Sequence, residues 1–86
     1  MEIIINESIE VKDILVGDVR ITNFSELLLF GIIKGNIVVE ENSSAIIYGT
    51  VNGNIDSQGK CKVYGIVKGG INGNVEIDSN AIINPK

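Results

Sequence analysis

The sequence predicts an all-β protein, a single-domain parallel β-helix (β-solenoid) with about 18 residues in each coil and nearly five coils. Three observations lead to this prediction: an internal repeat, apolar residues that alternate with a period of two, and a composition that disfavours helices. The chain has 86 residues, which is the size of one domain.

The repeat is visible in three segments: LLLFGIIKGNI (27–37), AIIYGTVNGNI (45–55) and CKVYGIVKGGI (61–71). Short strands that recur at a fixed period stack as coils of a solenoid. Extending the alignment predicts one domain over 1–86, with coils near 1–8 (partial), 9–26, 27–44, 45–60, 61–80 and 81–86 (partial). The predicted columns are Ile9, Leu27, Ala45, Cys61 and Ala81; Val11, Leu29, Ile47, Val63 and Ile83; and Gly17, Gly35, Gly53 and Gly73, followed by Asp18, Asn36, Asn54 and Asn74.

Alternation within each repeat indicates strands. Leu27, Leu29 and Ile33 are separated by even numbers of residues, so their side chains share one face of a strand. The chain contains 17 Ile, 10 Gly and 10 Asn, all poor helix formers. We expect glycine to provide positive φ angles at the corners. Parallel crossovers are right-handed by default, so we expect a right-handed coil.

Composition excludes several functions. The chain has no histidine and one cysteine, so it lacks a His-dependent nucleophile, an imidazole metal site and a cysteine zinc cluster. Its net charge of −4 argues against nucleic-acid binding, which needs a basic patch. No apolar run reaches the length of a transmembrane helix, and the N-terminus does not resemble a signal peptide. We therefore expect a cytoplasmic protein that is not an enzyme and needs no cofactor or metal.

The segments AIIYGTVNGNI (45–55) and CKVYGIVKGGINGNVEI (61–77) resemble bactofilins, the polymer-forming bacterial cytoskeletal proteins. The shared motif is small/aliphatic-x-aliphatic-x-Gly-x-Val-x-Gly-x-Ile, and the likeness covers about residues 27–83. The resemblance implies a right-handed triangular β-helix that assembles end to end without nucleotide. Residues 1–26 match this pattern poorly, and bactofilins usually have more coils.

Alternation also predicts which side chains point outward. Phe30, Tyr48 and Tyr64 occupy equivalent positions, so we expect an external column of aromatic rings. This column either stabilises the solenoid or belongs to an apolar surface that binds protein. The predicted interaction face is Leu28, Phe30, Ile32, Ile46, Tyr48, Tyr64 and Ile66.

Polar positions suggest two weaker sites. The stacked Asx residues at one corner favour an asparagine ladder, with a cation site at Asp18 and Asp56 as the alternative. Acidic turns predict either a solvated edge or a surface for a basic partner. The residues of this predicted acidic edge are Glu26, Glu40, Glu41 and Asp78. Cys61 lies in an apolar column, so we expect a small core residue.

The ends of a solenoid expose unpaired strand edges unless they are capped. No capping helix is apparent, and the candidate assembly residues are Ile3, Ile5, Ile82 and Ile83. The leading interpretation is a bactofilin-like scaffold that forms a homo-oligomer or filament through these ends and the apolar face. The alternative is a small acidic immunity or inhibitor protein that binds one partner, such as a toxin.

Overall fold

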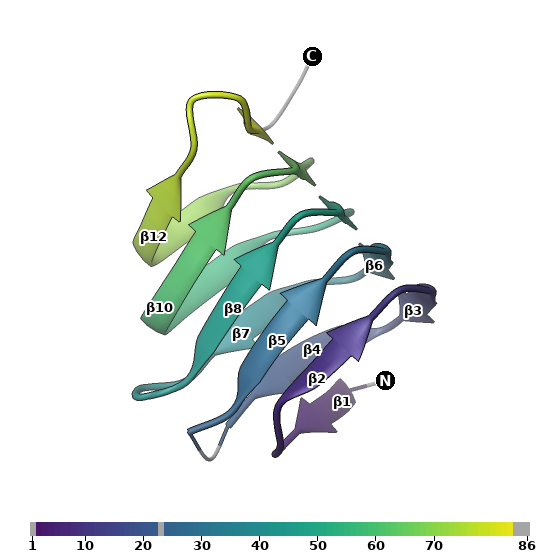
Figure 1. Ribbon diagram of the computed structural model, residues 1–86, viewed down its shortest axis with the longest axis vertical. Helices are drawn as coiled ribbons and strands as arrows, with labels where there is room; N and C mark the ends of the chain where they lie inside the picture. The colour runs from purple at the N-terminus through teal and green to yellow at the C-terminus, as the bar shows by residue number, and fades with distance from the viewer. Residues whose placement is uncertain (1, 23, 84–86) are drawn as a thin grey trace.

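The computed structural model describes residues 2–22 and 24–83, and parallel β-strands form a solenoid of about five coils (Figure 1). This confirms the predicted fold class; residues 1 and 84–86 of the predicted end coils lie outside the described part. The strands β2 (Ile9–Val11), β5 (Glu26–Leu29), β8 (Ser44–Ile47) and β10 (Ile55–Val63) rise to the right in front, and the chain returns behind them while it climbs from N to C. The coils therefore wind in the right-handed sense. No described segment forms a helix long and apolar enough to cross a membrane.

Strand pairing gives the solenoid three faces. Face 1 consists of β1 (Glu2–Ile5), β4 (Asp18–Ile21), β7 (Ile37–Val39) and the first parts of β10 (Ile55–Val63) and β12 (Ile71–Ile77). Face 2 consists of β2 (Ile9–Val11), β5 (Glu26–Leu29), β8 (Ser44–Ile47) and the second parts of β10 and β12. Face 3 consists of β3 (Ile14–Val16), β6 (Ile32–Lys34), β9 (Thr50–Val51), β11 (Ile66–Val67) and β13 (Ile82–Ile83).

Stacked aliphatic side chains fill the interior. On face 1, for example, Val19, Ile37 and Ile55 are in register and almost fully buried, and Ile33, Val51 and Val67 do the same on face 3. Burial of these columns removes apolar surface from water, which is the main force that stabilises such a small chain.

The coils shorten toward the C-terminus, and this corrects part of the predicted alignment. Leu27 pairs with Ala45, Ala45 with Cys61 and Cys61 with Val75, so each interval along the chain is shorter than the one before. Ala81 therefore does not stack on Cys61. Ile83 pairs with Val67 rather than Val63, and Gly73 pairs with Ser57 rather than Gly53.

The shortening begins where the separate turn at the corner between faces 1 and 2 is lost. In the earlier coils a turn separates the two faces, as at residues 40–43. In the next coil β10 runs from face 1 to face 2 without an intervening turn and bends at the corner, and its side chains alternate between buried and exposed along all nine residues. Gly59 makes this possible, because a Cβ there would collide with the carbonyl oxygen of Ser43.

Glycine is required at the corners mainly because the backbones approach closely. Among the described glycines, only Gly17 and Gly73 have positive φ, so the expected conformational role applies to few of them. At Gly31, Gly49 and Gly65 a Cβ would collide with the carbonyl oxygen of the coil below. The recurring glycine is therefore a consequence of tight stacking between successive coils.

Candidate interaction surfaces

The predicted column of aromatic rings is present at the corner between faces 2 and 3. Phe30 and Tyr48 stack with their centroids 5.2 Å apart and an interplanar angle of 3°. Tyr48 and Tyr64 stack at 5.0 Å and 10°. The three side chains, which we call the aromatic ladder, remain 48%, 50% and 40% exposed, respectively.

Backbone hydrogen bonds place the ladder and show what stands at its two ends. The Phe30 N–H donates to the carbonyl oxygen of Val11, and the Tyr48 N–H donates to that of Leu29. Because Lys12 follows Val11 as Phe30 follows Leu29, Lys12 lies below Phe30 just as Phe30 lies below Tyr48. The same pattern continues upward, since the Asp78 N–H donates to the carbonyl oxygen of Val63, the residue before Tyr64. The full column is Lys12, Phe30, Tyr48, Tyr64 and Asp78. The positively charged Lys12 therefore lies at one end of the ladder and the negatively charged Asp78 at the other.

A second column runs beside the ladder on face 3. Its members point outward because each precedes an inward residue, and the column reads Ile14, Ile32, Thr50, Ile66 and Ile82. The corner glycines Gly31, Gly49 and Gly65 lie between the two columns and add no side chain. The ladder and this column, which we call the face 3 column, form a mainly apolar strip, with Thr50 at its centre and the exposed Asp13 between Lys12 and Ile14 at its lower end.

All seven predicted residues of the interaction face point outward, but they occupy two different faces. Leu28 and Ile46 lie on face 2 and are half-buried. Their neighbours in the same column are charged, with Glu10 below and Lys62 and Glu76 above. The apolar part of face 2 therefore ends after two coils, whereas the strip at the ladder spans the described height of the solenoid. Ile82 belongs to this strip, although the sequence suggested it as an end residue.

The Asx ladder at the corner between faces 3 and 1 is also present, with one correction. The Asn36 N–H donates to Asp18 Oδ1 (3.0 Å), and the Asn54 N–H donates to Asn36 Oδ1 (2.8 Å). The next member is Gly70, whose N–H donates to Asn54 Oδ1 (2.7 Å). Asn74 lies elsewhere and donates its side-chain amide to the carbonyl oxygen of Gly59. The ladder therefore satisfies corner backbone groups.

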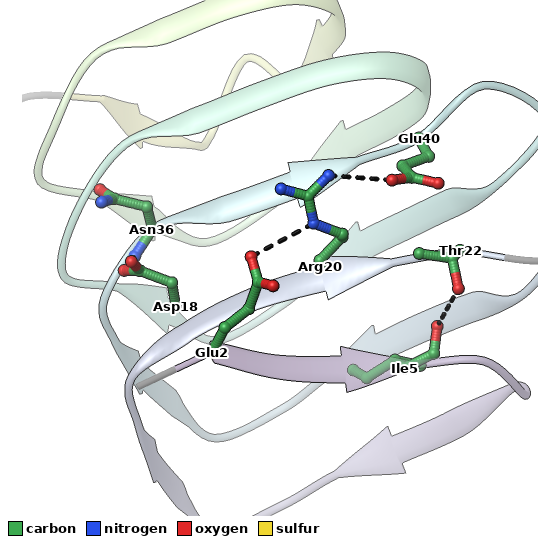
Figure 2. Close-up of polar contacts among 7 residues, drawn as sticks. All are labelled: Glu2, Ile5, Asp18, Arg20, Thr22, Asn36 and Glu40. Atoms are coloured by element: carbon green, nitrogen blue, oxygen red, sulfur yellow. Dashed lines mark hydrogen bonds and ion pairs between the residues drawn. The ribbon is translucent and has the colours of Figure 1, made fainter.

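Arg20 on face 1 links three coils, a role that the sequence pattern did not predict. Its Nε donates to Glu2 Oε2 (3.2 Å) and its Nη1 donates to Glu40 Oε2 (2.9 Å), as Figure 2 shows. Hydrogen bonds to Glu40 and Glu2 raise the pKa of the guanidinium above its usual value. The repeat could have indicated the contact between Arg20 and Glu2. Glu2 precedes Arg20 by one full coil and lies on β1, which pairs with β4, the strand that contains Arg20.

The predicted acidic edge is only partly assembled. Glu26, Glu40 and Glu41 all flank the corner between faces 1 and 2. Asp78 lies at the other end of face 2, above the aromatic ladder, so its assignment to this edge was wrong. Arg20 pairs with Glu40, which reduces the negative charge available to a basic partner.

Cys61 is a buried core residue, as expected from its column. It is 2% exposed, and burial raises the pKa of its thiol to about 12. The thiolate needed for reactivity is therefore disfavoured at neutral pH.

The two ends of the described solenoid expose part of its interior. At the first coil Ile3 and Leu15 are half-buried, while Ile5 is almost fully covered. At the last coil Ile83 is half-buried and Ile77 is 49% exposed, although Ile77 stacks on the fully buried Val63. Ile77, rather than Ile82, is therefore the exposed interior residue at that end.

No three Cys, Asp or Glu side chains among residues 2–22 and 24–83 lie close enough together to hold a metal ion. No family model, curated protein or solved structure matches the chain. The fold and the surfaces described above are therefore the basis for a functional proposal.

Proposed function

We propose that this protein is a non-enzymatic, bactofilin-like scaffold whose copies stack end to end. The observation that supports this most is that each face contains five parallel strands within residues 2–22 and 24–83. The strands β1, β2 and β3 of a second copy would therefore meet β12 and β13 of the first and continue all three faces. Backbone edges that are unpaired in one copy would become hydrogen-bonded.

The side chains at the two ends suit this continuation. The interior residues Ile77 and Ile83 at the top of one copy would meet Val11 and Leu15 at the bottom of the next. Lys12 of the upper copy would stand above Asp78 of the lower copy, at the spacing of about 4.8 Å between parallel strands. One repulsive pair, Glu10 above Glu76, opposes these contacts and lies on the exposed side of face 2.

Variants that block one end at a time test the proposal. Ile3→Glu places a charge in the interior of the first coil, and Ile77→Glu does the same in the last coil. The matched control is Ile4→Glu, because Ile4 is in the same strand but points outward and is 58% exposed. Sedimentation velocity and electron microscopy should detect polymers of the unmodified chain and of the control, and circular dichroism should verify that each variant is folded.

Mixing the two end variants reveals the direction of stacking. Head-to-tail stacking predicts that each end variant alone is monomeric and that the mixture forms a one-to-one dimer and nothing larger. Dimers that form with Ile77→Glu but not with Ile3→Glu would indicate head-to-head contact between two first coils instead, because a contact that spares the ends would form equally in both variants. A strictly monomeric unmodified chain at high concentration would refute the proposal.

The alternative function, neutralisation of a basic partner such as a toxin, has less support. It depends on an acidic surface, yet Glu40 is paired with Arg20 and Asp78 is separate from Glu26 and Glu41. A stoichiometric complex with a single basic protein, recovered by affinity capture and lost on charge reversal of Glu26 and Glu41, would favour it.

A further inference from the structure

We propose that the apolar strip formed by the aromatic ladder and the face 3 column is a two-fold interface, on which a second copy of this chain docks side by side in the antiparallel direction. This lateral contact goes beyond end-to-end stacking and does not require it. It is carried by the order of the residues along the strip, which is symmetric about the third coil.

The face 3 column has the same sequence of side chains in both directions. Its central member is Thr50, with Ile32 and Ile66 on either side and Ile14 and Ile82 at the ends. A two-fold axis that passes beside Thr50 and runs across the solenoid turns one copy upside down. Ile14 then faces the partner copy's Ile82, Ile32 faces Ile66, and Thr50 faces its own counterpart.

The ladder column is symmetric in shape and complementary in charge. Tyr48 is its central member, and the same axis places Phe30 opposite Tyr64 of the second copy. Lys12 at one end then lies opposite Asp78, and this charge pair forms twice. If the two solenoids ran parallel instead, Lys12 and Asp78 would lie at opposite ends of the contact and could not meet, so charge favours the antiparallel pair.

The flanking residues define the limits of the contact. Lys34 and Lys68 follow Ile33 and Val67 on face 3 and are exposed at the outer side of the strip. In the antiparallel pair these two lysines approach each other at the rim, where long side chains keep their charge in water. On the other side, Lys62 and Glu76 on face 2 are exposed and adjacent, 3.9 Å apart. Charge therefore borders part of the strip, beside the apolar Val16 on face 3 and the apolar Leu28 and Ile46 on face 2.

The size of the strip sets the strength of the pair. Five strands at about 4.8 Å spacing give a height of about 24 Å, and two columns about 7 Å apart, with the width of their side chains added, give a width of about 12 Å. The strip therefore covers roughly 300 Å² on each copy. Stable interfaces bury about 800 Å² on each partner, so an isolated pair is weak. Copies already stacked end to end would present the strip repeatedly and pair with much higher avidity.

Disulfide cross-linking tests the geometry in the full chain. Cys61→Ala supplies a cysteine-free background, and Ala45 already occupies the equivalent position one coil below. The interface variants are Thr50→Cys, Ile14→Cys and Ile82→Cys. The control is Asp56→Cys, an exposed outward position on face 1. Each is oxidised at high protein concentration in the presence and absence of Ile3→Glu and Ile77→Glu, which block the ends.

The antiparallel pair predicts a specific pattern. Thr50→Cys should form a covalent dimer with itself, and Ile14→Cys should form one only when mixed with Ile82→Cys. Two Ile14 side chains in the pair are about four strand spacings, or ~19 Å, apart, which is beyond the reach of a disulfide. The control should give the background yield. Cross-links that persist in end-blocked chains support lateral pairing even if end-to-end stacking fails.

Charge exchange provides a second measurement in the same end-blocked chains. Lys12→Asp or Asp78→Lys alone should lower the yield of the Thr50→Cys dimer several-fold, and the two together should restore it. Self-cross-linking of Ile14→Cys would overturn the antiparallel arrangement. A Thr50→Cys yield no higher than that of the control would overturn the interface and leave the strip available to a different partner.

Discussion

The aromatic ladder makes a quantitative prediction, because its central ring is stacked on both sides and its outer rings on one. Tyr48 lies 5.2 Å from Phe30 and 5.0 Å from Tyr64, and the three side chains are similarly exposed. Their apolar burial is therefore similar and largely cancels in a comparison. A stacked aromatic pair contributes about 0.5–1.5 kcal/mol beyond burial.

Tyr48→Ala removes two such pairs, so we expect it to lower the free energy of unfolding by about 1–3 kcal/mol more than burial alone. Tyr64→Ala removes one pair and should cost about half of this additional amount. A difference of about 1 kcal/mol corresponds to roughly 4–8 °C in Tm for a domain of this size. Tyr48→Phe is the matched control, since it keeps the ring and Phe30 already fills the equivalent position one coil below.

Urea denaturation followed by circular dichroism measures these differences, at protein concentrations low enough to avoid association. The double variant Phe30→Ala with Tyr48→Ala adds a coupling test, because Phe30→Ala should cost less once Tyr48 is gone. Equal losses for Tyr48→Ala and Tyr64→Ala, or a cost of Phe30→Ala that is the same in both backgrounds, would refute the reasoning.

Three further predictions concern the backbone and the core. Gly49→Ala should cost about 1–3 kcal/mol in urea denaturation, because its Cβ meets the carbonyl oxygen of Gly31, whereas Gly70→Ala should be tolerated because its Cβ lies 3.8 Å from Asn54 Oδ1. Asn54→Ala should cost about 1 kcal/mol and speed hydrogen exchange at the Gly70 amide, while Asn54→Asp keeps the acceptor and the protection. The raised pKa of the Cys61 thiol, about 12 when folded against 9.0 for an unburied thiol, favours its neutral form in the fold. Stability should therefore fall as pH rises from about 9, by about 1 kcal/mol at pH 10, and Cys61→Ala should lack this part of the decline.

The first three coils could be predicted almost completely from the sequence. Inward residues such as Leu27, Ile33 and Ile37 are buried, and the outward Phe30 and Tyr48 stack as expected. This succeeded because alternation determines which side chains point into a solenoid, and a constant period then places equivalent residues one above another.

Contacts between coils were harder to predict when the partners lay outside the repeated motif. Arg20 reaches Glu2 in the coil below and Glu40 in the coil above. A single sequence shows three charged residues without indicating that one guanidinium bridges both carboxylates. Asp78 was similarly placed in the wrong corner, because the turn in which it lies follows a shortened coil.

The sequence by itself determined the fold class, the inward and outward faces and the position of the aromatic ladder. Only the tertiary structure decided the register of the last two coils, where Val75 rather than Ala81 stacks on Cys61 and Gly70 rather than Asn74 stacks on Asn54. The physical reason is that shifting a strand by an even number of residues leaves the same side chains pointing inward. Alternation cannot distinguish such registers, and the hydrogen bonds and close backbone packing at Gly59 select one of them.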